Sequence, residues 1–238
     1  MCSYFNTSSL YEFLFETISL DDMQQEVFIP MYKKQELIQQ YGTVRRYQKD
    51  KEGIKYHYLK ILHPIMRFML HFRALFITRY IKKKYAIQKY DVIHAHSLLF
   101  NGSVARNLSK KYNKPYIVAV RNTDLEVLSK LPIYKKMARK IMKDASEIVF
   151  ISESLKDKFQ KQIFMWDATI ERKISVIPNG ISDEWYIEDI QHHQFTKEKI
   201  KFIYQGTLLE RKRVEYVLSI IKKLNQDGYN CEYKIYGD

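Results

Sequence analysis

The chain has 238 residues, of which 46% are hydrophobic and 28% are charged. These proportions are typical of a globular protein and exclude a disordered chain or a collagen-like repeat. Its two cysteines, Cys2 and Cys231, are too few for a disulfide framework and do not show zinc-site spacing, so we expect free thiols in a reducing compartment.

The beginning of the chain does not have the pattern of a signal peptide. Glu12, Glu16, Asp21 and Asp22 come before any Lys or Arg, whereas a signal peptide has a basic start followed by an apolar run. Charged residues interrupt the other apolar runs well before a bilayer-spanning length is reached. We therefore expect a cytoplasmic protein, either soluble or bound peripherally to the inner face of the cell membrane.

Short apolar runs alternate with segments of helical spacing along the whole chain. Runs of this kind suit parallel strands that are covered on both faces, and the alternation predicts a doubly wound α/β fold. In chain order, the expected elements are a helix at 9–18, a strand at 27–29, a helix at 62–84, a strand at 92–96, a helix at 103–112, a strand at 116–120, a helix at 126–143, strands at 148–151, 174–177 and 202–204, a helix at 214–227 and a strand at 233–236.

The pattern also predicts where domains begin and end. Pro178-Asn179-Gly180 is a strong turn followed by a polar stretch. We therefore expect a first domain at 1–177, a linker at 178–199 and the beginning of a second domain at 200–238. Only Cys2–Phe5 precede the first loop, so the first strand is expected to be clipped. Two strands and one helix cannot cover both faces of a sheet, so the second domain is expected to be incomplete.

One segment supplies most of the net charge of +13. Residues 44–90 carry thirteen Lys or Arg against two acidic residues, a local net charge of +11. Such a field attracts phosphate groups of anionic lipids, acidic polymers or nucleic acids. Within it, aromatic residues recur at spacings of four along the expected helix at 62–84: Phe68, Phe72, Phe76 and Tyr80.

Two interpretations of this helix remain open. In the first, the aromatic stripe packs on the sheet and the charges face water. In the second, the helix lies on an anionic membrane surface. Binding of single-stranded nucleic acid is a weaker possibility, because no RRM, KH or helix-turn-helix pattern accompanies the basic segment.

Polar residues follow two of the expected strands in the first domain. His94 and His96 share one face of the strand at 92–96, and Arg121 and Asp124 come directly after the strand at 116–120. The carboxyl ends of parallel strands meet the ligand in open α/β sheets. His96 is placed for hydrogen bonding or acid–base chemistry, although it can also bond only to backbone. Arg121 can hold a phosphate or a carboxylate. Asp124 can either face the crevice or cap the next helix.

A loop with diphosphate-binding character follows the first strand of the second domain. Gly206 allows the backbone to approach a ligand closely, the following helix offers free N–H groups, and Lys212 adds a full positive charge. The alternative is a basic, solvated loop. The spacing does not match a Walker A motif or a GxGxxG motif.

Taken in order, these segments resemble the family 4 glycosyltransferases, which have the GT-B architecture of two facing Rossmann-like domains. Each motif alone is loose, but six in family order are specific. They are DVIHAH at 91–96, PYIVAVRNTD at 115–124, ASEIVFISESL at 145–155, KISVIPNGI at 173–181, IKFIYQGTLLERKRVEYVL at 200–218 and YKIYGD at 233–238.

The resemblance implies a chemistry and residues to perform it. It implies transfer of a sugar from a nucleotide-sugar donor, with retention at the anomeric carbon and without a metal or other cofactor. His96 would lie near the transferred sugar, and Lys212 would neutralise the leaving diphosphate. Gly206, Thr207 and Arg211 would complete the diphosphate site, while Asn6, Thr7, Ser8, Arg121 and Asp124 would line the acceptor side of the cleft.

Some residues depart from the family pattern. Thr207 stands where the family often has Arg, the loop at Asn6–Ser8 has no Gly, and no later acidic motif lies within the 238 residues. Two readings follow: a truncated glycosyltransferase that transfers sugar poorly by itself, or a half-enzyme module that binds acceptor or membrane and needs a partner chain. A basic nucleic-acid-binding α/β protein is a third, weaker reading. Self-association through the second domain and a role in extracellular or capsular polysaccharide synthesis are expected, whereas donor, acceptor and linkage are not indicated.

Overall fold

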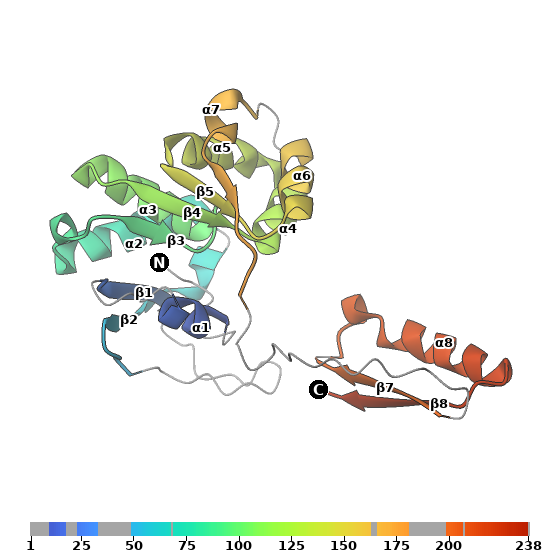
Figure 1. The fold of residues 1–238 in the computed structure, drawn as a ribbon. Coiled ribbons are helices and arrows are strands. Elements are labelled where there is room, and N and C mark those ends of the chain that lie inside the picture. The colour runs from blue at the N-terminus through green and yellow to red at the C-terminus, as the bar shows by residue number, and fades with distance from the viewer. Residues whose placement is uncertain are drawn as a thin grey trace. The chain divides into compact units, whose positions relative to one another are not determined.

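The computed structural model describes residues 10–17, 23–32, 49–67, 69–162, 166–180, 199–206 and 208–237. Contacts divide these residues into two compact units, one within 10–180 and one within 199–237. Both units are α/β (Figure 1). The predicted fold class, α/β with a Rossmann-like domain built on a parallel sheet, is confirmed.

A four-stranded parallel sheet forms the centre of the first unit. Its strands lie in the order β3-β4-β5-β6. They are β3 (Ile93–Ala95), β4 (Tyr116–Val120), β5 (Glu147–Phe150) and β6 (Ile174–Val176), and they are connected by α3 (Phe100–Tyr112), α4 (Asn122–Lys130), α5 (Lys135–Asp144), α6 (Glu153–Gln162) and α7 (Ala168–Glu171).

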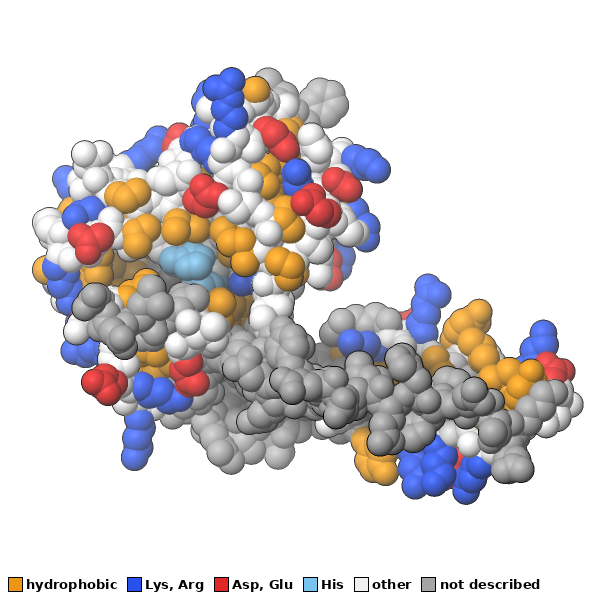
Figure 2. Space-filling model, viewed as in Figure 1, with side chains coloured by type: hydrophobic (Ala, Val, Ile, Leu, Met, Phe, Trp, Pro, Cys, Tyr) orange, Lys and Arg blue, Asp and Glu red, His pale blue; other side chains and the backbone are white. Residues whose placement is uncertain are grey.

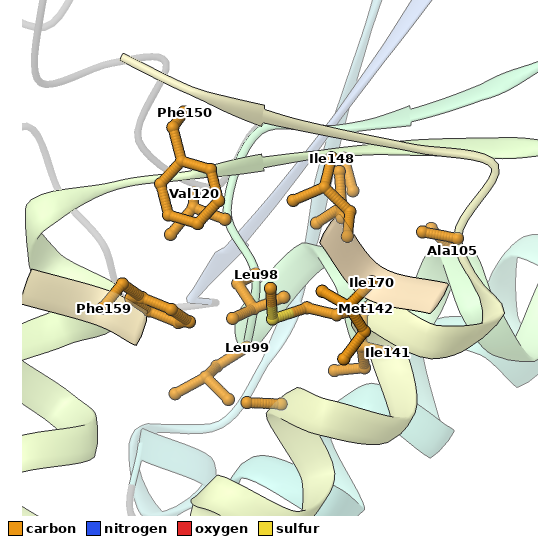
Figure 3. Packing of buried hydrophobic residues seen from close by; sticks show 14 of the residues in the cluster. Leu98, Leu99, Ala105, Val120, Ile141, Met142, Ile148, Phe150, Phe159 and Ile170 are labelled. Atoms are coloured by element: carbon orange, nitrogen blue, oxygen red, sulfur yellow. The ribbon is translucent and has the colours of Figure 1, made fainter. Parts of the chain in front are cut away.

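The largest apolar core lies between this sheet and its helices. Figure 3 shows Ile148 and Phe150 of β5 directed toward the side chains of α5 and α6, among them Met142 and Phe159. All four side chains are fully buried. The strands are short and nearly continuous in apolar residues because both sides of a parallel sheet must be covered by helices or loops.

A second parallel sheet of two strands belongs to the same unit. β1 (Gln25–Tyr32) pairs with β2 (Ile54–Leu62), and α1 (Leu10–Thr17), the 3₁₀ turns η2 (Pro64–Arg67) and η3 (Ile87–Lys89), and α2 (Leu70–Lys84) complete this part. The sequence pattern did not predict β2. In the sequence, Lys55 and Lys60 make this stretch look like part of a solvated basic segment. In the structure, both lysines are exposed on β2, while Tyr56, Leu59 and Ile61 of the same strand are buried.

Two predicted helices differ from the observed ones. The helix expected at 126–143 is divided into α4 and α5 by the 3₁₀ turn η4 (Pro132–Tyr134), because Pro132 removes a backbone donor and clashes with a continuing helix. The helix expected at 62–84 begins only at Leu70, since residues 54–62 form β2 and Pro64 opens a 3₁₀ turn.

The structure excludes one of the two interpretations of the aromatic stripe on α2. Phe72 and Phe76 are 62% and 37% exposed, while Leu70, Ala74, Ile77 and Ile81 are buried. The interpretation in which these two aromatic residues pack on the sheet is therefore wrong. Tyr80 is partly buried against the core, and Phe68 lies outside the described residues.

The second unit has a single β-α-β arrangement in its described residues. β7 (Ile200–Gln205) and β8 (Cys231–Tyr236) pair in parallel, and they are connected by η6 (Glu210–Lys212) and α8 (Val214–Gln226). Within 199–237, the buried hydrophobic residues are Ile221 and Cys231, and Cys231 is a free thiol. Phe202, Ile203 and Ile235 of the strands are exposed, so apolar surface remains uncovered on this unit.

Candidate active site

Polar side chains gather where the strands of the first unit end. His96 comes directly after β3, Arg121 directly after β4, and Asn179 shortly after β6. The Arg121 Nη1 atom donates a hydrogen bond of 3.0 Å to Asn179 Oδ1, and the guanidinium lies 5.7 Å from the ring centroid of Tyr11. The carboxyl edge of the sheet, where α/β proteins bind ligands, therefore carries a fixed positive charge.

His96 is buried beside this charge. It is only 2% exposed, and its ring makes edge contacts with the rings of Phe15 and Tyr11, at centroid distances of 5.0 and 5.8 Å. Nδ1 of His96 has no hydrogen-bond partner within the part of the chain that the structure describes. Burial lowers the pKa of His96 well below its ordinary value, so the imidazole is neutral at pH 7 and one ring nitrogen retains its lone pair.

His94 lies next to His96, at a ring centroid distance of 4.1 Å. Burial lowers the pKa of His94 to about 3, so neither histidine carries a charge at neutral pH. Both line a small cavity of about 120 Å³ together with Phe15, Gln25 and Glu26. Figure 2 shows histidine side chains, in pale blue, in a hollow bordered by hydrophobic side chains.

Asp124 has a different position from the one that the resemblance implied. It is fully buried, and its carboxylate accepts hydrogen bonds of 3.0 Å from the backbone N–H groups of Leu98, Leu99 and Arg121. It was expected to line the acceptor side of a cleft, but the folded chain encloses it. Asp124 instead accepts a hydrogen bond from the backbone N–H of Arg121 at the N-terminus of α4, which is the capping role that the sequence left open as its alternative. It also joins this end of α4 to the segment that follows His96, and so acts as a positioning residue.

Three of the expected acceptor-side residues cannot be placed. Asn6, Thr7 and Ser8 lie outside the described residues, as does Thr207 of the second unit, and nothing is described of the Arg211 side chain. Their implied roles stay predictions.

Two glycines meet at the carboxyl ends of β7 and β8. The N–H of Gly206 donates to Tyr236 O over 3.0 Å, and the φ of Gly206, +153°, is one that residues with a Cβ rarely adopt. A Cβ on Gly237 would lie 1.7 Å from Gly206 O, so neither position accepts a side chain without rearrangement. Sequence reasoning selected Gly206 but missed Gly237, although a second Gly directly after a second parallel strand was a usable signal.

Lys212 lies a short distance further along the chain. It ends η6, is exposed, and comes two residues before the first residue of α8. Arg213 between them has a φ of +52° and accepts backbone N–H bonds from Tyr216 and Val217. Next to this turn, a hollow of about 390 Å³ is lined by Glu210, Arg213, Glu215 and Tyr216. Two of these four residues are acidic, so the elements of an anion site in the second unit are the exposed cations of Lys212 and Arg213 and the N-terminus of α8.

A parallel α/β domain with polar groups at the carboxyl edge of its sheet defines a Rossmann-like ligand-binding domain. Residues 26–185 match the model of Glycosyltransferase Family 4. Because the match spans more than half of the chain, the protein belongs to this family, and its domain is one that uses a sugar donor and an acceptor as substrates. A search among curated proteins found no relative that matches.

Two further findings concern the described residues. None of their helices has the length and apolar character needed to pass through a bilayer. No group of three or more His, Cys, Asp or Glu residues among them is arranged to hold a metal ion.

Proposed function

We propose that this protein transfers a sugar from a nucleotide-sugar donor to a glycan or lipid-linked acceptor, with retention at the anomeric carbon and without a metal cofactor. One observation supports this most: His96, buried and neutral, lies beside the cation of Arg121 at the carboxyl edge of the sheet. A family 4 domain with this pair has the means to bind and orient a sugar ring and a negatively charged group.

The proposed role of His96 follows from its surroundings. Its ring contacts the rings of Phe15 and His94, and its buried Nδ1 atom has no hydrogen-bond partner among the described residues. A neutral imidazole in an apolar pocket accepts a hydrogen bond from a sugar hydroxyl, or donates one, without the cost of burying a charge. Arg121, held by Asn179, supplies the positive charge for a phosphate or an acidic acceptor group.

The proposed role of Lys212 is to stabilise the leaving diphosphate. Negative charge grows on the leaving group as the sugar–oxygen bond breaks, so a fixed cation stabilises the transition state more than the ground state. Gly206, Gly237 and the N-terminus of α8 fit the same role, because bare backbone and free N–H groups accept the close approach of a diphosphate.

The test is the release of nucleoside diphosphate from a panel of nucleotide sugars, with and without glycan and lipid-linked acceptors, followed for long enough to detect slow turnover. We expect Lys212→Ala to lower the rate by roughly 10²-fold and His96→Ala by roughly 10²-fold or more. Lys222→Ala, which removes an exposed lysine on α8, is the matched control and should leave the rate unchanged. Retention predicts that donor and product share the same anomeric configuration by NMR. Release that neither His96→Ala nor Lys212→Ala changes would contradict the assignment.

A second candidate function is a half-enzyme module that binds acceptor or membrane and needs a partner chain. The observation that favours it is the exposed apolar surface of Phe202, Ile203 and Ile235 on the second unit, which also suits self-association. In this case the chain alone transfers sugar poorly. No diphosphate release, together with binding of acceptor that Arg121→Ala weakens, would favour this candidate over the first.

The cellular setting is part of the same proposal. We propose that the protein works in the cytoplasm, at the inner face of the cell membrane, through its basic segment at 44–90, and that it serves the synthesis of an extracellular or capsular polysaccharide. Binding of nucleic acid is not expected.

A further inference from the structure

The outward face of α2 has apolar residues at one end and basic residues at the other. Phe72, Phe76, Arg79 and Lys83 follow one another at spacings of four, three and four, which places them along one side of a helix. All four are exposed. Met69, directly before the helix, and Ile65 in η2 are exposed as well. We call the set of Met69, Phe72, Phe76, Arg79 and Lys83 the α2 ridge.

Packing of the opposite face fixes the orientation of the ridge. Ala74, Ile77 and Ile81 are almost completely buried in the core against β2 and α3. Arg73 is buried as well, with its guanidinium 4.9 Å from the ring centroid of Phe100 and its Nη1 3.4 Å from Tyr32 Oη. A rotation of α2 that buried Phe72 would bring these groups to the surface. Turning the α2 ridge inward would therefore have a large cost in folding free energy.

The densest group of positive charge in the described part of the segment lies at the end of α2. Lys51 pairs with Glu16, Lys89 pairs with Glu26, and Arg73 is buried, whereas Lys49, Lys55 and Lys60 are exposed but lie apart from one another in the sequence. The last turns of α2 carry Arg79 and three consecutive lysines at 82–84, all exposed. No Asp or Glu occurs in the sequence between Glu52 and Asp91, so no acidic side chain of this segment weakens the field.

We propose that the α2 ridge docks the protein on an anionic lipid bilayer. Met69, Phe72 and Phe76 would enter the boundary between headgroups and acyl chains, while Arg79 and Lys83, with their neighbours Lys82 and Lys84, would contact lipid phosphates. This inference rests on the proposed work at the membrane and names the residues responsible for it. It does not depend on the donor or on the chemistry of transfer.

The arrangement of the ridge favours lipid over nucleic acid. Besides Phe72 and Phe76, its apolar end includes Met69, with Ile65 close by in the sequence, and these two non-aromatic side chains give a nucleobase no surface on which to stack. The apolar and basic parts follow each other along the helix instead of alternating. A bilayer, which is apolar inside and anionic at its surface, matches that separation.

The test is cosedimentation with mixed phosphatidylglycerol–phosphatidylcholine vesicles and with pure phosphatidylcholine vesicles. We expect salt-dependent binding to the anionic vesicles only, because the attraction is screened within a Debye length. Phe72→Ser/Phe76→Ser should weaken binding roughly tenfold or more, and Lys82→Gln/Lys83→Gln should weaken it by a similar factor. Ile133→Ser, at an 81% exposed apolar residue in η4, is the matched control and should bind like the unchanged protein.

A second measurement reports insertion directly. In Phe72→Trp, the emission of the new indole should shift to the blue when anionic vesicles are added, whereas in Ile133→Trp the emission should not shift. Unchanged thermal melting of both serine variants would show that they remain folded.

Three outcomes would overturn the proposal: equal binding to neutral vesicles, binding that the Phe72→Ser/Phe76→Ser variant retains in full, or a preference for poly(U) that this variant abolishes. Failure of the proposed sugar transfer gives a different pattern. Release of diphosphate from a soluble nucleotide sugar is measured without vesicles and should survive the ridge substitutions, while Lys212→Ala should leave vesicle binding intact.

Discussion

Two buried or half-buried carboxylates in the first unit have opposite electrostatic surroundings. Burial raises the pKa of Asp124, whose oxygens are bonded only to backbone N–H groups. Glu26 on β1 receives hydrogen bonds from His57 Nε2 at 2.8 Å, from Tyr90 Oη at 2.7 Å and from Lys89. Burial opposes ionisation of Glu26, but these partners outweigh it and lower its pKa to about 2. The first carboxylate positions a loop, and the second joins β1, β2 and η3.

Replacement of Asp124 should destabilise the first unit strongly. Asp124→Ala leaves two buried N–H groups and one half-buried N–H group without an acceptor. Each buried loss costs about 1–3 kcal/mol, so we expect a loss of about 3 kcal/mol or more in the free energy of unfolding. Chemical denaturation measures it. Asp157→Ala, at an exposed residue of α6, should change the stability little. A small effect at Asp124 would show that water or another group replaces the carboxylate.

The low pKa of Glu26 predicts a pH dependence of defined sign. A carboxylate whose pKa is lower in the folded chain stabilises the fold above its unfolded pKa of 4.5, and this contribution is lost as the pH falls through about 2. The stability difference between the unchanged protein and Glu26→Gln should therefore be constant above about pH 5 and shrink toward pH 2. Urea denaturation across this range measures it. A difference that grows on acidification would contradict the hydrogen-bond arrangement described here.

At the scale of the element, close packing limits which side chains the buried face of a helix can accommodate. Gly102 in α3 lies against the sheet and α5: a Cβ at this position would be 2.9 Å from Ile141 Cγ2 and 3.2 Å from Val118 Cγ2. The absence of a side chain lets α3 approach β4 closely, and α3 begins four residues after His96. The distance between helix and sheet therefore contributes to the position of the candidate site.

Enlarging this contact should therefore be costly. Gly102→Val introduces a Cβ and two methyl groups where no space exists, and overpacking of this kind costs about 1–3 kcal/mol. Thermal melting should show a clear decrease in Tm. Lys111→Val places the same β-branched side chain on the exposed side of α3 and controls for helix propensity, which is worth only about 0.5 kcal/mol. Equal effects of the two substitutions would mean that propensity, and not packing, limits this helix.

The chain divides into two compact units, so a substitution that destabilises one unit should leave the other unit folded. The first unit has several buried apolar clusters, whereas the described part of the second buries little beyond Ile221 and Cys231. The second unit should therefore open at a lower free energy, since few buried contacts resist its opening.

Hydrogen exchange can test this independence. Gly237→Ala would place a Cβ 1.7 Å from Gly206 O and 2.8 Å from Gly206 C, so the ends of β7 and β8 must separate. We expect faster exchange of the β7 and β8 amides in this variant and unchanged exchange in β3–β6. Gly102→Val should produce the reverse pattern. Acceleration of both units by either substitution would show that they unfold together.

Much of the fold could be predicted from the sequence because its determinants are local. Apolar runs of strand length, helical spacing and the turn at Pro178-Asn179-Gly180 are all properties of neighbouring residues, and they indicated the parallel α/β fold and the position of His96 at the end of β3. The six motifs in order indicated the family that the match over 26–185 shows. In contrast, β2 was not predicted, because in the sequence its lysines resemble those of a solvated basic segment. Only the structure shows that these lysines are exposed while residues between them are buried.

Contacts between distant segments decided the rest. Asp124 accepts hydrogen bonds from residues 25 and 26 positions earlier in the sequence. A local sequence pattern could not show these bonds, which bury Asp124 and keep it out of the cleft. Phe72 and Phe76 have the spacing of a core stripe, and only the packing of Ala74, Ile77 and Ile81 on the other side leaves them exposed. The pair of Gly206 and Gly237 likewise needs the pairing of β7 with β8. Local sequence patterns predict which segments form helices and strands. Tertiary packing determines which face of each element is buried, because burial depends on all the surfaces that pack together.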